Sequence, residues 1–97
     1  AFGPGRHTLK TLNIPILTED RRRDLVKMVH HRLEETRIAI RNVRRDLMKD
    51  LRDFEKEKLI SEDDLEEAEE ELQKLTDREI HQVEVIGERK QKEIMEV

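Results

Sequence analysis

The chain has 97 residues and a net charge of −4, with 45% charged residues, 2% aromatic residues and no cysteine. This length allows one small domain with a limited core, and the lack of cysteine excludes disulfides, thiolate catalysis and cysteine-bound metal. The charge is unevenly placed: residues 19–58 sum to +3 and residues 59–97 to −9. A polyanion would therefore be attracted to the first half only. Without an apolar run of about 20 residues or a signal-peptide core, a membrane protein is not expected.

Residues 1–17 contain both prolines and two of the three glycines, so we predict an extended or flexible segment there. Thr8 to Leu17 is compatible with a short strand that leads into a hinge, because Pro15 forces Ile14 toward extended geometry. The predicted hinge residues are Asn13, Ile14, Pro15, Ile16 and Leu17.

Two long helices are predicted in residues 18–97. Thr18 is a suitable N-cap, and the helix that follows should run to about Lys56. Ser61 with Asp64 resembles a capping box at the start of the second helix, whose apolar residues recur at mostly three- and four-residue steps, with Gly87 as a local weak point. The predicted fold is all-α: an antiparallel hairpin, two helices of a three-helix bundle, preceded by the extended hinge.

A helical wheel separates two faces of the first helix. Apolar or core-compatible residues lie between about −120° and −40° relative to Arg37. Basic residues lie between about −20° and +80°, and this cationic face is expected to adjoin the packing face and to stay exposed. Its members are Arg23, Lys27, Arg37, Arg41, Arg44, Arg45 and Arg52. The apolar surface is wider than a two-helix seam requires, which predicts a further helix from another copy, another protein or an absent part of the parent protein.

From Leu12 onward the chain resembles the C-terminal part of the ribosome recycling factor family. The resemblance rests on the segments 12–15, 17–23, 39–46, 60–64 and 73–77, in the family's order and spacing over about 86 residues. It implies a factor with a three-helix bundle and a small α/β domain. Such a factor binds the large ribosomal subunit after termination and, with elongation factor G, splits the ribosome.

The resemblance also implies which residues bind RNA. Arg41, Asn42, Arg44 and Arg45 match the family's arginine motif, whose arginines contact large-subunit rRNA. We extend the prediction to Arg37 and Arg52, which share the cationic face of the wheel. Further partners implied are elongation factor G and the missing N-terminal helix of the parent protein or a substitute helix. The implied location is the bacterial cytoplasm or an organellar matrix or stroma.

Plainer readings exist for each pattern. The arginines could be a solvated face paired with glutamates such as Glu34 and Glu35. Arg21 to Arg23 fits helix-start solvation as well as RNA contact, and the acidic run Glu66 to Glu71 is typical of a solvated surface. His30 and His31 lack metal-ligand spacing, and Ser61 lacks a base, so no metal, cofactor or catalytic residue is predicted. The rival hypothesis is a coiled-coil interaction module without RNA binding; an enzyme is a distant third.

Overall fold

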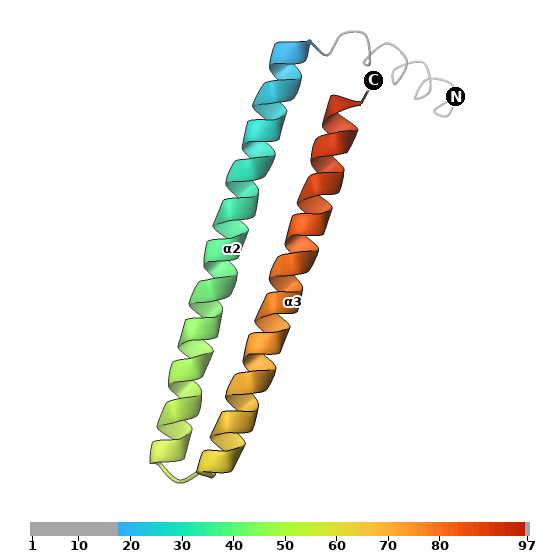
Figure 1. Cartoon of the computed structure of the whole chain (residues 1–97). Coiled ribbons are helices and arrows are strands. Elements are labelled where there is room, and N and C mark those ends of the chain that lie inside the picture. Colours follow the sequence, from blue (N-terminus) through green and yellow to red (C-terminus); the bar gives the residue numbers. More distant parts are fainter. Residues whose placement is uncertain (1–17, 97) are drawn as a thin grey trace, which may run out of the picture.

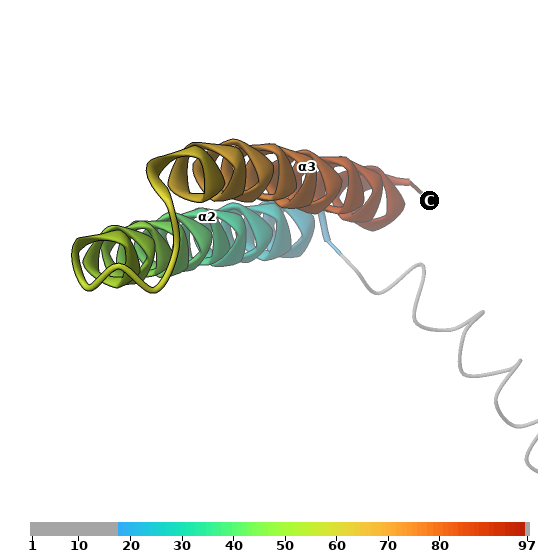
Figure 2. The ribbon, with the colours of Figure 1, turned by 90° about the horizontal axis from the view of Figure 1, so that it is seen from below.

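The computed structural model describes residues 18–96, which form two helices joined by a short turn (Figure 1). Helix α2 spans Glu19–Lys56 and helix α3 spans Glu62–Met95. They run antiparallel along nearly their whole length, so the start of α2 and the end of α3 lie at the same end of the hairpin. Seen from the turn, they form a single layer (Figure 2). The predicted all-α hairpin is therefore confirmed.

The N-termini of both helices are capped as the sequence predicts. The hydroxyl of Thr18 accepts a hydrogen bond from the backbone N–H of Arg21 at 3.1 Å. Ser61 and Asp64 form a reciprocal capping box: Asp64 N–H donates to Ser61 Oγ at 3.0 Å, and Ser61 N–H donates to Asp64 Oδ2 at 3.3 Å. Acidic residues lie in the first turn of each helix, where their negative charge interacts favourably with the positive end of the helix dipole.

The turn between the helices contains an unusual residue. Lys58 has a φ of 62°, in the left-handed region that normally favours glycine. The N–H of Lys58 donates to Glu55 O and the N–H of Leu59 donates to Phe54 O, both at 2.9 Å, which is the hydrogen-bond pattern of a Schellman motif. These bonds satisfy two of the last carbonyls of α2, and the chain reverses direction within the five residues 57–61.

The helices approach each other closely at Gly87, which is buried in α3. A Cβ atom added there would clash with the Cδ1 methyl of Leu33 and lie 2.8 Å from its Cδ2 methyl. The absence of a side chain lets Leu33 of α2 rest against the α3 backbone. Gly87 therefore has a packing role, in addition to weakening the helix locally.

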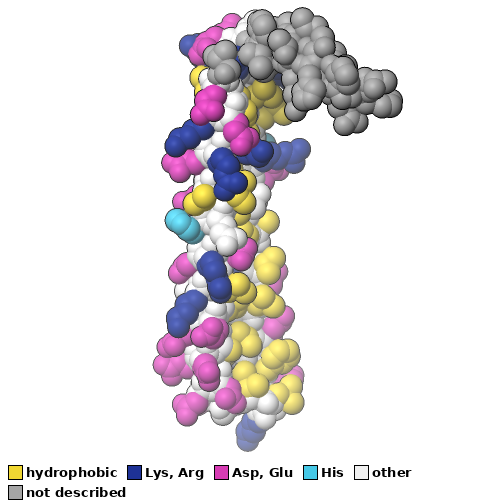
Figure 3. All heavy atoms as spheres, turned by 90° about the vertical axis from the view of Figure 1, so that its right-hand side faces the viewer, with side chains coloured by type: hydrophobic (Ala, Val, Ile, Leu, Met, Phe, Trp, Pro, Cys, Tyr) yellow, Lys and Arg dark blue, Asp and Glu magenta, His cyan; other side chains and the backbone are white. Residues whose placement is uncertain are grey.

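One face of the hairpin remains apolar and open. Within residues 18–96 no hydrophobic side chain is buried, and Met28 and Val43 keep 57% and 58% of their surface exposed. A groove of about 330 Å³ runs between the helices beside Val43, Leu47, Leu72 and Leu75, and a second of about 340 Å³ continues it beyond Thr36. Figure 3 shows hydrophobic side chains along one side of the rod. Two helices alone leave this surface in water, as the width of the stripe predicts.

The predicted hinge, Asn13 to Leu17, and the predicted strand before it lie outside the described residues. Within the described helices, neither is long and apolar enough to cross a membrane.

Candidate nucleic-acid interface

Helix α2 carries the six residues predicted to bind RNA. Because α2 is continuous from Glu19 to Lys56, their directions follow from the helical repeat. Arg41, Asn42, Arg45 and Arg52 are exposed, whereas Arg37 and Arg44 are half-buried. The expected continuous exposure of the cationic face therefore holds for Arg41, Arg45 and Arg52, but not for the other two arginines. The reason is that Arg37 and Arg44 lie on the side of α2 that faces α3.

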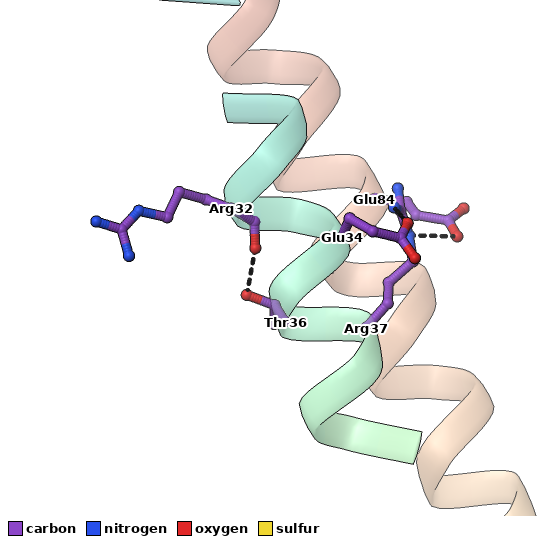
Figure 4. A network of polar contacts seen from close by, with 5 residues as sticks. All are labelled: Arg32, Glu34, Thr36, Arg37 and Glu84. Atoms are coloured by element: carbon purple, nitrogen blue, oxygen red, sulfur yellow. Dashed lines mark hydrogen bonds and ion pairs between the residues drawn. The ribbon is translucent and has the colours of Figure 1, made fainter. Parts of the chain in front are cut away.

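Arg37 is held by carboxylates from both helices. Its Nη1 donates to Glu34 Oε2 at 2.9 Å, and its Nε lies 3.7 Å from Glu84 Oε1 of α3. Only 23% of the Arg37 side chain is exposed. Figure 4 shows Arg37 extending toward both carboxylates where the helices meet, whereas Arg32 points away from this group. Two carboxylates offset the guanidinium charge, and the pair with Glu84 links α2 to α3. We call this role of Arg37 the clamp.

Arg52 also pairs with α3, near the turn. Its Nη2 lies 3.4 Å from Glu69 Oε2. The arginine side chain is 61% exposed, so this pair is screened by water and contributes little to stability. Arg37 and Arg52 thus share one feature, a carboxylate partner on α3.

The central arginines have no such partner. Among the ion pairs within residues 18–96, none involves Arg41, Arg44 or Arg45. Arg44 Nη1 instead donates to the neutral amide oxygen of Gln73 at 3.4 Å. Their guanidinium charges therefore have no carboxylate partner within the described residues, which suits bidentate contact with phosphate and stacking on unpaired bases.

Some other charged residues of α2 pair within the helix. Arg23 lies 3.9 Å from both Glu19 and Asp20, while Arg22 is buried. Glu35 pairs with Arg32 at 3.8 Å and lies 3.5 Å from the imidazole of His31. The reading of charges paired along the helix therefore describes these residues and Glu34, and it does not extend to Arg41 or Arg45.

The comparison with known families decides the relationship. A family description for ribosome recycling factor matches residues 6–95. The chain belongs to the ribosome recycling factor family. It is 52% identical over 86 residues to the ribosome-recycling factor of Roseiflexus sp. (strain RS-1), and 54% identical over 86 residues to those of Chloroflexus aurantiacus and Heliobacterium modesticaldum. Each match covers 89% of this chain and 46% of the relative. The chain thus spans about half the length of these ribosome recycling factors.

Proposed function

We propose that this hairpin is the part of a ribosome recycling factor that binds large-subunit rRNA after termination. The observation that carries the proposal is the group of guanidinium charges at Arg41, Arg44 and Arg45, which have no carboxylate partner in the described residues, whereas Arg37 and Arg52 on the same helix pair with carboxylates of α3. Family membership supports the same assignment, because the relatives are named ribosome-recycling factors. Asn42 is exposed within the same turn and would add a neutral donor and acceptor.

The proposed mechanism is mechanical and involves no bond chemistry in this chain. A rod of two continuous helices transmits force along its axis once one face is fixed to rRNA. Elongation factor G would supply the force through its own GTP hydrolysis, and the two ribosomal subunits would then separate. The acidic surface of α3 opposes indiscriminate attachment to nucleic acid, so the cationic face of α2 defines the orientation of binding.

The apolar groove would be covered by a third helix from the parent protein or by a substitute helix. Exposed hydrophobic residues on both helices support this part of the proposal. A three-helix bundle would bury the groove and leave Arg41 and Arg45 free, since these arginines lie on a different side of α2 from Val43.

The test is co-sedimentation of the chain with purified bacterial large ribosomal subunits. Reversing two charges in Arg41→Glu/Arg44→Glu removes two charge-assisted contacts of about 1.5 kcal/mol each, so affinity should fall roughly 100-fold. The matched control, Arg78→Glu/Arg89→Glu, makes the same charge change at exposed positions of α3. Equal weakening by both variants, or no binding by the folded chain, would contradict the proposal.

The open groove also favours a second candidate, a coiled-coil interaction module that associates through its apolar face. Salt separates the two candidates. Apolar association, measured as mass by light scattering, should persist as salt rises, whereas rRNA affinity should fall steeply.

A further inference from the structure

The segment 73–77 on α3 contacts Arg44 of α2 through Gln73, and the proposed function assigns it no role. Thr76 in this segment is buried, and its hydroxyl donates to the carbonyl of Leu72 at 2.8 Å. One turn of helix separates Gln73 from Asp77, and Gln73 Nε2 donates to Asp77 Oδ1 at 2.9 Å. The amide oxygen of Gln73 remains available and accepts from Arg44 Nη1. Hydrogen bonds therefore run from Asp77 through Gln73 to Arg44.

Arg44 differs from Arg37 and Arg52 in the charge of its α3 partner. Arg37 meets Glu84 and Arg52 meets Glu69, both carboxylates. A carboxylate would have to be displaced, or its repulsion overcome, before a phosphate could approach the guanidinium. The amide of Gln73 directs the guanidinium while leaving its full charge and its remaining N–H donors for an incoming anion.

The amide of Gln73 is itself directed by Asp77. An amide can present either its oxygen or its NH2 group, and only the oxygen can accept from a guanidinium. Because Asp77 accepts from the NH2 group, the oxygen is left facing Arg44. Arg44 also lines the apolar groove beside Val43 and Leu47, which restricts its side chain from the other side. Ordering Arg44 in advance lowers the entropy lost when it binds RNA.

We propose that Gln73, held by Asp77, is a positioning residue that orients the Arg44 guanidinium for a backbone phosphate without neutralising it. This inference rests on the proposed rRNA-binding function. It assigns α3 a part in RNA binding although α3 is strongly acidic.

Two variants test the proposal with purified bacterial large ribosomal subunits as the probe. Gln73→Ala removes the acceptor and should weaken binding about threefold to tenfold, the effect of ordering one long side chain. The exchange Gln73→Glu/Asp77→Asn keeps the net charge and the hydrogen bonds but places a carboxylate against Arg44. Binding should then weaken at least as much, while the melting temperature stays equal or rises. If Gln73 had only a structural role, binding affinity and melting temperature would change in the same direction.

The matched control for the exchange is Gln82→Glu/Asp77→Asn. It has the same composition and charge, but its new carboxylate is at exposed Gln82, away from Arg44. This control should bind more tightly than the exchange variant; equal affinities would overturn the inference. Relaxation of the Arg44 side-chain 15N nucleus gives a readout without RNA: it should report greater mobility in Gln73→Ala, and unchanged mobility would contradict positioning.

The outcomes also distinguish this inference from the function on which it rests. If the chain binds subunits and Arg41→Glu/Arg44→Glu abolishes binding, but both Gln73 variants bind normally, only the positioning role fails. If the folded chain does not bind at all, both proposals fail.

Discussion

The arginines predicted to bind RNA, which run from Arg37 to Arg52, differ in electrostatic setting between the centre of this series and its two ends. At the ends, Arg37 and Arg52 meet carboxylates of α3. At the centre, Arg41 and Arg45 are exposed and Arg44 meets only a neutral amide. Arg37 and Arg52 link the two helices through these carboxylates, whereas in the proposed function the central arginines keep their charge for rRNA. Basic residues on one face of a helix therefore need not share one function.

The largest expected effect concerns the contact at Gly87, which holds the two helices together near Arg37. Its partner Leu33 lies one turn from Arg37. Gly87→Val would place its side chain against Leu33 and force the helices apart. We expect a loss of about 2 kcal/mol in the free energy of unfolding, typical of overpacking, measured by denaturation followed by circular dichroism. The control Gln82→Val, at an exposed position of the same helix, should change stability by less than about 0.5 kcal/mol. Similar losses in both variants would mean that the helices do not pack closely here.

A second test changes stability without touching either class of arginine. Lys58 adopts a left-handed conformation that costs a residue with a side chain about 1 kcal/mol relative to glycine. Lys58→Gly should therefore stabilise the hairpin by somewhat less than about 1 kcal/mol, because glycine also gains freedom in the unfolded chain. Subunit binding should not change. A destabilised variant would contradict the turn geometry, and altered binding would implicate the turn in recognition.

The smallest expected effect concerns the ion pairs of Arg37 with Glu34 and Glu84. Arg37→Gln removes an ion-pair partner of both Glu34 and Glu84. Because these carboxylates are more than half exposed, we expect a loss of only about 0.5 kcal/mol by thermal unfolding. The control Arg41→Gln should leave the melting temperature unchanged. If Arg41→Gln were the more destabilising of the two, the assignment of clamp and ligand-binding roles would be reversed.

Local chemistry explains which features could be predicted from the sequence. The caps at Thr18 and Ser61 depend on hydrogen bonds within a few residues, so the sequence pattern places both helix starts correctly. The left-handed turn at Lys58 lacks the glycine that would have indicated it. Gly87 could be recognised as a weak helix former, but its contact with Leu33 depends on a residue more than 50 positions away in the sequence.

For the candidate site, too, the features within one helix could be predicted from the sequence, whereas the contacts between the helices could not. A wheel of one helix places the arginines on a common face, yet it cannot say which α3 residue comes opposite each of them. The partners Glu84, Gln73 and Glu69 follow from the register of the two helices, which is set by the turn and by packing at Gly87. The sequence alone does not single out Gln73, because the same helix also contains Gln82 and Gln91. A role for Gln73 can be inferred only from its position beside Arg44 in the structure.

The most direct test of the central claim compares two charge-matched pairs, Arg41→Gln/Arg45→Gln at the centre and Arg37→Gln/Arg52→Gln at the ends. Both lose two positive charges, and each is titrated against purified large ribosomal subunits over a series of salt concentrations, with helicity checked by circular dichroism. The centre pair should weaken binding and reduce the slope of log affinity against log salt by about 2, one for each lost phosphate contact. The end pair should leave that slope unchanged. An equal reduction by the end pair, or none by the centre pair, would contradict the account.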